Sequence, residues 1–239
     1  MGFGKMNKLN VLYEDNHIIV VEKEPNMLSQ SDITGDMDLL TIIKEYIKTK
    51  YNKPGNVYIG LVHRLDRPVG GIIVFARTSK AAKRLNEQIR NHEFNKTYVA
   101  ILDGILDKKK GKLINYLYKD EKLKKSFVTD KNNKNAKLSE LNYEVIGYYK
   151  DKTIVKINLI TGRHHQIRVQ FSNIGYPLCG DQLYGVKNKK QIKLFSYKLE
   201  FIHPTLMKKL TFKMLPKWEE LEDETIIHRL WWSYIRYYD

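Results

Sequence analysis

The chain has 239 residues, 42% hydrophobic and 29% charged, an ordinary composition for a globular protein with a buried core. Its 42 lysines and arginines exceed its 27 aspartates and glutamates, which gives a net charge of +15. Such an excess favours a polyanionic partner, because neutralising phosphates releases condensed counterions, although an acidic membrane surface would also attract it. A single cysteine, Cys179, excludes an internal disulfide and a cysteine-clustered zinc site.

Targeting signals are not found in the sequence. The first residues lack the apolar core of a signal peptide, and the longest apolar stretches are far too short to span a bilayer. We therefore expect a cytoplasmic protein without a membrane partner. No internal repeat or flexible linker separates two halves, so we expect one domain over residues 1–239, with a core at about 11–214.

The first sixty residues predict two strands followed by a helix. Residues 11–13 and 17–22 are apolar runs separated by the turn signal of residues 14–16. Residues 39–51 carry apolar side chains at helical spacing, and Pro54 should end that helix.

The next stretch predicts a strand, a helix and another strand, followed by a polar region. Residues 71–76 form a short apolar run, and Ser79 is the expected N-cap of the helix after it. Residues 96–102 alternate between apolar and polar side chains, as a strand does. Residues 108–137 are dense in lysine and give only weak strand signals, so we expect mainly solvated loops there.

The remainder of the chain predicts a hairpin, a helix, two closing strands and a last helix. Residues 164–174 suit a helix in which His164 and Arg168, four residues apart, share one face. The other predicted elements are strands at residues 141–149, 153–160, 193–201 and 210–214, and a helix at residues 218–238.

The densest motif, residues 61–71, places Asp66 between Arg64 and Arg67 and just ahead of Pro68 and two glycines. Neighbouring arginines favour the ionised form of a carboxylate, and glycines allow a backbone to approach a ligand closely. By itself the motif also fits a surface cluster of salt bridges.

A second motif, residues 159–168, turns at Gly162 and then presents Arg163, two histidines, a glutamine and Arg168. Many hydrogen-bond donors at the start of a helix suit contacts with phosphates or bases. Adjacent histidines on a helix point about 100° apart and cannot readily chelate one ion. No acidic pair nearby completes a ligand set, so we expect no bound metal.

Together these motifs resemble those of the RluA-type pseudouridine synthases. The family's His-Arg-Leu-Asp segment matches residues 63–76, and its Leu-x-Thr-Gly-Arg-x-His-Gln-Ile-Arg segment matches residues 159–168. Its Lys-x-Tyr, Gly-Asp-x-x-Tyr-Gly and His-Pro motifs match, in the same order, residues 96–98, 180–185 and 203–204. The resemblance implies an α+β fold with a central mixed, largely antiparallel sheet, flanking helices and an active site in a basic cleft.

The resemblance also implies an activity: isomerisation of selected uridines in ribosomal or transfer RNA, without cofactor or metal. The base is detached at N1, turned and rejoined to the ribose through C5, so the uridine must be flipped out of its stack. Few residues precede the first strand, and we expect no N-terminal RNA-binding module and a monomeric enzyme. Target selection would then depend on the catalytic domain, the lysine-rich middle and residues 218–239.

Three residues carry the catalytic roles that the resemblance implies. Asp66 is the essential carboxylate, which either attacks the sugar or base or removes a ribose proton; both roles need an ionised oxygen held in place. Arg168 would pair with Asp66 and keep it charged in a dry pocket. Tyr98 would stack against the uracil and assist proton removal at C5.

Four further residues are expected to bind substrate. Ile167 would press on the opposite side of the uracil ring, and Arg64 would occupy the space that the flipped nucleotide leaves. Arg163 and Lys96 are expected to make phosphate or structural contacts.

Other functions remain open from the sequence. A non-catalytic RNA-binding protein would explain the charge equally well but not a carboxylate within an arginine-rich loop. A hydrolase could use Asp66 with His63 or His165 as a base, and would release uracil or cut RNA. A DNA-binding regulator would need a paired-helix reading motif, which the sequence lacks.

Overall fold

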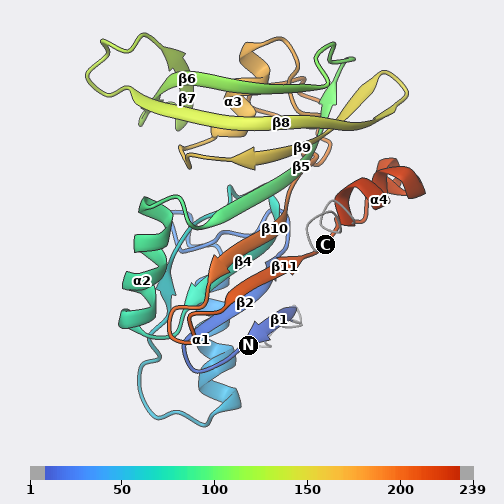
Figure 1. Ribbon diagram of the computed structural model, residues 1–239. Helices are drawn as coiled ribbons and strands as arrows, with labels where there is room; N and C mark the ends of the chain where they lie inside the picture. The colour runs from blue at the N-terminus through green and yellow to red at the C-terminus, as the bar shows by residue number, and fades with distance from the viewer. Residues whose placement is uncertain (1–8, 232–239) are drawn as a thin grey trace. The chain divides into compact units, whose positions relative to one another are not determined.

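The computed structural model describes residues 9–231, and the chain forms two compact units. The first unit contains residues up to 94 together with 198–214, and the second contains residues 95–197 and those from 215 onward. Both units combine antiparallel strands with flanking helices (Figure 1), which confirms the predicted α+β class. Among the described residues, no helix is long and apolar enough to cross a membrane.

The first unit is built on the strand order β1-β2-β4-β10, with β3 beside β4 and β11 beside β10. The pairs β1–β2, β2–β4, β3–β4 and β10–β11 are antiparallel. Its elements are β1 (Val11–Glu14), β2 (Ile18–Lys23), α1 (Leu39–Lys50), β3 (Gly60–Leu61), β4 (Gly70–Ala76), α2 (Ser79–Arg90), the last residues of β10 (Leu194–Ile202) and β11 (Lys209–Lys213).

Strand β4 lies at the centre of the first core. All seven of its residues are buried, because sheet neighbours flank both edges and a helix packs against it. Helix α2 contributes Ala81 and Leu85 to the same cluster, and Phe94 stacks on Phe201 with ring centroids 5.1 Å apart. The loop that precedes β4 is therefore anchored on a rigid strand.

The second unit has the strand order β10-β5-β9-β8-β6-β7, and the pairs from β5 to β7 are antiparallel. Helix α3 packs against β6 and β7, and helix α4 packs against β8. Its elements are β5 (Asn95–Asp103), β6 (Lys110–Asp120), β7 (Lys125–Thr129), β8 (Lys137–Tyr149), β9 (Lys152–Leu159), α3 (Gln166–Asn173), the first residues of β10, the 3-10 turn η1 (Glu219–Leu221) and α4 (Glu224–Trp231).

Most predicted elements match the observed ones to within a few residues, and four differ. The lysine-rich stretch forms the long hairpin β6–β7 and the start of β8 where loops were expected. Helix α2 is capped by Thr78, whose hydroxyl accepts from the Ala81 N–H at 3.1 Å, so Ser79 is its first residue. Helix α3 begins at Gln166, two residues later than predicted. The last helix begins at Glu224, six residues later than predicted, and residues 232–238 lie outside the described part.

His203, from the late His-Pro motif, joins two turns of the first unit. Its Nδ1 accepts from the Leu206 N–H at 2.9 Å, so the proton of the neutral ring lies on Nε2, which donates to Asp15 at 2.7 Å. Asp15 in turn accepts from the backbone N–H groups of His17 and Ile18 at 2.7 and 2.8 Å. The fully buried imidazole thus ties the β10–β11 turn to the β1–β2 turn.

Replacement of His203 tests whether this motif residue is structural. We expect His203→Ala to lower the free energy of unfolding by about 2 to 4 kcal/mol, because it leaves a cavity and removes the hydrogen bonds of the imidazole to Asp15 and to the Leu206 N–H. Urea denaturation followed by circular dichroism measures the change. Leu206→Ala, at an exposed position of the same turn, should change stability by less than about 0.5 kcal/mol. Equal effects of the two variants would contradict the role given to His203.

Candidate active site

Asp66 lies in the first unit, in the loop that joins β3 to β4. Its side chain is partly exposed, whereas that of Leu65 before it is buried. The loop turns tightly after the carboxylate, because the Val69 N–H donates to the Asp66 carbonyl at 2.9 Å. Ser29 fixes the preceding residue from the other side: its hydroxyl donates to the Leu65 carbonyl at 2.9 Å and accepts from the Leu65 N–H at 3.2 Å.

A buried lysine supports this loop from below. Lys23 is fully buried, and its ammonium donates to the carbonyls of Glu24, Arg67 and Val69 at 3.1, 3.0 and 2.7 Å. Burial lowers the pKa of Lys23 to about 7, against the opposing effect of the Asp66 and Glu24 carboxylates. Three carbonyl acceptors require three N–H donors, which only the ammonium form supplies. Lys23 therefore fixes the backbone on which Asp66 is carried.

The two arginines that flank Asp66, Arg64 and Arg67, lie in different surroundings. Arg67 forms a salt bridge with Asp36 at 2.7 Å, and both side chains are about half exposed. Arg64 is exposed. Arg67 is thus paired with a residue of the preceding loop, a contact that the motif alone did not indicate.

Tyr98 and Ile167 lie in the second unit, and both side chains are almost fully buried. Tyr98 is on β5, opposite Ile157 of β9, and Ile167 is in the first turn of α3. Lys96 precedes Tyr98 by two residues on β5, and burial lowers the pKa of its ammonium. A Cβ at Gly162 would come within 3.3 Å of the Lys96 Nζ, so the glycine of the Thr-Gly-Arg motif leaves room for this cation.

Arg168 forms the central ion pair of the second unit. Its Nε and Nη2 donate to Oδ2 and Oδ1 of Asp181, both at 2.8 Å, in a bidentate geometry. Oδ1 of Asp181 also accepts from the backbone N–H groups of Leu183 and Tyr184 at 2.9 and 3.1 Å. Burial acts to raise the pKa of Asp181, but Arg168 and the two backbone donors outweigh it and hold the pKa below its usual value.

Tyr184 supports the guanidinium group and links it to β7. The Arg168 Cζ lies 5.2 Å from the centre of the tyrosine ring, within the range of a cation–π contact. The Tyr184 hydroxyl accepts from the Ser126 N–H at 2.8 Å and lies 3.0 Å from Nδ1 of His165. Gly180, at φ +73°, lets the chain pass close to Gln191, whose carbonyl would lie 2.3 Å from an added Cβ.

The two adjacent histidines correct one prediction. His165 has left-handed backbone angles, φ 54° and ψ 22°, so His164 and His165 precede the helix and the four-residue spacing to Arg168 no longer places His164 on its face. The two rings stack with centroids 3.7 Å apart, where a helix would have separated them. Among the described residues, no group of three His, Cys, Asp or Glu side chains could hold a metal ion.

The other polar residues of this motif fix the turn before α3. Oε1 of Gln166 accepts from the Thr161 hydroxyl at 2.8 Å and from the Arg163 N–H at 3.0 Å, and its Nε2 donates to the Glu140 carbonyl at 3.0 Å. The exposed side chain of Arg163 donates through Nε to the carbonyl of Leu138 at 2.9 Å. The side chains of Gln166 and Arg163 thus both take part in local structure.

Within the second unit, the structure brings Arg168 together with residues to which the sequence analysis gave no role. Asp181 and Tyr184 both belong to the Gly-Asp-x-x-Tyr-Gly motif, so the signal was present in the sequence without an assigned function. Asp66 and Arg64 belong to the first unit.

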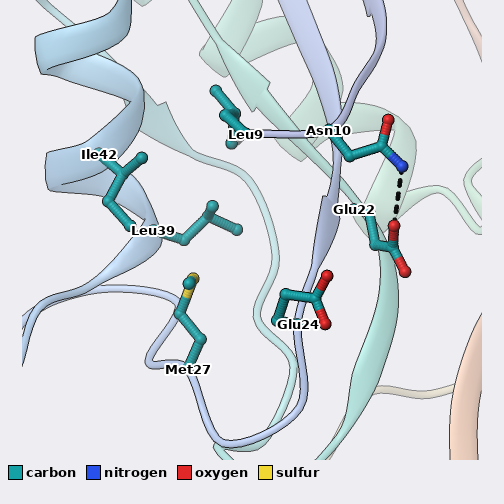
Figure 2. A pocket seen from close by; sticks show the side chains of 7 residues that line it. All are labelled: Leu9, Asn10, Glu22, Glu24, Met27, Leu39 and Ile42. Carbon is teal, nitrogen blue, oxygen red and sulfur yellow. Dashed lines mark hydrogen bonds between the residues drawn. The ribbon is translucent and has the colours of Figure 1, made fainter. Parts of the chain in front are cut away.

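A pocket lies elsewhere in the first unit, between α1 and the start of β1 (Figure 2). Across its edge the amide of Asn10 donates to Glu22 at 2.8 Å. None of the predicted site residues line it. Its lining residues are Leu9, Asn10, Glu22, Glu24, Met27, Leu39 and Ile42.

Comparison with known proteins establishes the family. The RNA pseudouridylate synthase family matches residues 17–173, a range that contains Asp66, Tyr98 and Arg168. A human RNA pseudouridylate synthase domain-containing protein 4 has a similar fold, with a TM-score of 0.73 at 21% identity over 92% of both chains. The chain therefore belongs to the RNA pseudouridine synthases, a class of isomerases, and the family resemblance drawn from the motifs is confirmed.

Curated relatives agree with this assignment. An uncharacterized RNA pseudouridine synthase of Aquifex aeolicus is 32% identical over 86% of this chain and 69% of its own length. The ribosomal large subunit pseudouridine synthase C of Buchnera aphidicola is 30% identical over 84% of this chain and 64% of its own length. The chain thus spans about two thirds of the length of these relatives.

Removal of the buried ammonium tests the support of the Asp66 loop. We expect Lys23→Met to lower the free energy of unfolding by about 2 kcal/mol, because three carbonyls lose their donor while a buried charge is removed. Hydrogen exchange at the Val69 amide, which donates within the loop, should also become faster relative to that at the amides of β4. Lys48→Met, at an exposed position of α1, is the control and should change neither quantity. An unchanged exchange rate at the Val69 amide in the Lys23 variant would show that the loop is equally stable without the ammonium.

Removal of the Asp181 charge tests the buried pair through pH. Asp181→Asn leaves Arg168 as an uncompensated buried charge and should cost about 3 to 5 kcal/mol near neutral pH. The folded-state pKa of Asp181 lies below the unfolded value of about 3.9, so its stabilisation is present above about pH 4 and is lost as the pH falls through the folded value. Urea denaturation of both proteins should therefore show a constant difference in the neutral range and a shrinking one below about pH 4. A difference independent of pH would mean that Asp181 acts only through its shape.

Proposed function

We propose that this protein converts selected uridines of RNA to pseudouridine, with Asp66 as the catalytic carboxylate. The conversion breaks the bond from C1′ to N1 and forms one from C1′ to C5; the proton at C5 is lost and N1 gains one. Atoms therefore balance without an external reagent.

One observation supports Asp66 above the other carboxylates of the first unit. It is carried by a loop whose backbone is fixed on both sides, by Ser29 before it and by the buried Lys23 after it. A catalytic oxygen must be held in position before the substrate arrives, because reorganisation during the reaction raises the barrier. Asp66 is partly exposed, as a residue that meets a substrate must be.

The remaining roles follow from the family resemblance. Tyr98 and Ile167 are proposed to hold the uracil ring between apolar surfaces, and Arg168 is proposed to be the ionic partner of Asp66. The ion pair with Asp181 and the contact with the Tyr184 ring would keep the planar guanidinium group of Arg168 in one orientation. Arg64 is proposed to occupy the space that the flipped nucleotide leaves, and Arg163 and Lys96 are proposed to make phosphate or structural contacts.

Ribosomal RNA is the substrate class we favour over transfer RNA. The relatives of Buchnera aphidicola and of Borreliella burgdorferi are named ribosomal large subunit pseudouridine synthases C and D. The excess of 42 basic over 27 acidic residues suits a highly structured polyanion.

A proton-release assay tests both the activity and the residue. RNA from cells that lack the gene, labelled with tritium at uridine C5, should release tritium to water when the purified protein is added. Asp66→Asn should reduce the rate at least roughly a thousandfold, because it removes the ionised oxygen, while RNA affinity changes little. Asp32→Asn, an exposed carboxylate in the same unit, is the matched control and should keep the wild-type rate.

Mapping of pseudouridine in the same cells identifies the target. One or a few modified positions should be lost without the gene and restored by the wild-type chain but not by Asp66→Asn. Release of uracil or shortening of the RNA would instead indicate a hydrolase. Tight RNA binding with no tritium release from any RNA would favour a non-catalytic RNA-binding protein, and full activity of Asp66→Asn would refute the assignment of this residue.

A further inference from the structure

Within residues 9–231, the hairpin β6–β7 and strand β8 have one face covered by α3, and no helix covers most of the opposite face. On the covered face, Leu117, Ser126, Ser139 and Leu141 are buried beneath α3 or its flanking turn. Helix α4 reaches only the far end of β8, where Arg229 donates to the Ile146 carbonyl and Ile226 lies against Gly147. In Figure 1, α3 lies behind these strands and no helix lies in front of β6 and β7.

The face away from α3 carries an apolar strip with an unusual number of aromatic rings. Cross-strand register places Tyr116 opposite Leu138 and Tyr118 opposite Phe127, so these side chains share this face. Ile114 and Leu138 are 53% and 42% exposed, and the three aromatic side chains are partly exposed. We call Ile114, Tyr116, Tyr118, Phe127 and Leu138 the outer strip.

Two rings of the outer strip contact each other on this partly exposed face. Tyr118 and Phe127 lie side by side across the strands, with centroids 5.7 Å apart and planes inclined by 23°. The Lys125 ammonium lies 5.6 Å from the centre of the Phe127 ring. Adjacent aromatic rings on an open sheet are a surface on which unpaired bases stack.

Lysines surround the outer strip. Residues 108–137 contain eleven lysines and three acidic residues, a large share of the excess charge of the chain. Lys122 and Lys124 are exposed in the β6–β7 turn beside Leu123, which is 63% exposed, and Lys137 is exposed at the start of β8. Arg163 is bonded to the carbonyl of Leu138, at the border of the strip. This charge complements the phosphates of a nucleic acid and disfavours the approach of a second copy of the same basic surface.

We propose that the outer strip is a second RNA-contacting surface, on which unpaired bases stack while the surrounding lysines contact phosphates. It is separate from the residues proposed for catalysis in this unit, because Arg168 and Ile167 belong to the helix that covers the other face of the sheet. The inference rests on the proposed function only in taking RNA as the partner. Its role would be to hold a single-stranded segment that flanks the modified site.

The stacking part is tested by removing rings while keeping apolar side chains. Binding of a fluorescein-labelled oligouridylate of twenty nucleotides is followed by fluorescence anisotropy. The double variant Tyr118→Leu, Phe127→Leu should bind at least about tenfold more weakly, because each stacked base contributes roughly 1 to 3 kcal/mol. The control double variant Tyr58→Leu, Tyr148→Leu removes two exposed tyrosines outside the strip and should bind as the wild type does. Thermal unfolding must be similar for both; if the strip variant unfolds early, Tyr116→Leu alone replaces it.

The phosphate part is tested by the salt dependence of the same binding. Lys122→Ala with Lys124→Asn should flatten the slope of log affinity against log salt by about 1.4, since each single-strand phosphate contact contributes about 0.7. Asparagine is used at position 124 because that residue has φ 49°. Lys48→Ala with Lys53→Ala removes the same charge from exposed positions of the first unit and should leave the slope unchanged.

Crosslinking locates the contact directly. An oligouridylate that contains 5-iodouridine should crosslink under ultraviolet light to peptides that contain Tyr116, Tyr118 or Phe127, as identified by mass spectrometry. Crosslinks confined to other peptides, or equal affinities of the strip and control variants, would refute the inference. A wild-type dimer that the leucine variant dissociates, measured by light scattering, would assign the strip to self-association instead.

These measurements can refute the RNA-binding role of the outer strip without refuting the proposed activity, and the reverse also holds. Anisotropy and crosslinking need no turnover, so a protein that never releases tritium can still bind through the outer strip. Conversely, a strip variant with wild-type affinity and wild-type tritium release would refute this inference and leave the proposed activity intact.

Discussion

A buried ammonium ion determines how the loop of Asp66 is built. Lys23 ends β2, and the antiparallel register of β2 with β4 places it opposite Gly71, directly below the segment that it binds. A buried charge without partners would cost several kcal/mol, so the loop must bring its carbonyls to Nζ, and it does so with Arg67 and Val69. These hydrogen bonds fix the backbone of residues 67–69, the segment that directly follows Asp66 in the chain.

In the second unit, a buried positive charge is stabilised by a carboxylate instead of by carbonyl groups. Arg168 is buried on α3, and Asp181 reaches it from a loop that Gly180 allows to pass close to Gln191. Tyr184 then covers the guanidinium group and anchors the loop to β7 through Ser126. Each of the two motifs therefore stabilises the other: the arginine needs its carboxylate, and the carboxylate is held by a turn that Gly180 permits.

Periodicity predicted the elements whose burial is one-sided or complete. The continuous apolar run of β4 and the stripes of α1 and α2 are strong signals, since the residues that they bury are apolar. Strand β6 escaped prediction because its outer face combines isoleucine and tyrosine with lysine, and its covered face combines two leucines with glycine, asparagine and lysine. Neither face therefore has the hydrophobicity of a core strand. The start of α3 was placed two residues early because nothing in the sequence marks the left-handed backbone of His165. The site residues came from motif matching, whereas the Arg168–Asp181 pair joins positions thirteen residues apart that only a folded loop brings together.

The positively charged side chains of the protein are of two kinds, buried and exposed. Lys23 and Arg168 are buried and satisfied by carbonyls or a carboxylate, so they shape the protein and do not contact a partner at its surface. The lysines of residues 108–137 are mostly exposed and border β7, an edge strand, where lysines commonly prevent a strand from pairing with another chain. That purpose accounts for the lysines but not for Tyr116, Tyr118 and Phe127, because a surface shaped only to avoid association would replace exposed rings with polar side chains. Rings and lysines on the same open sheet are better explained together, as a surface for a partner with both flat bases and negative charge.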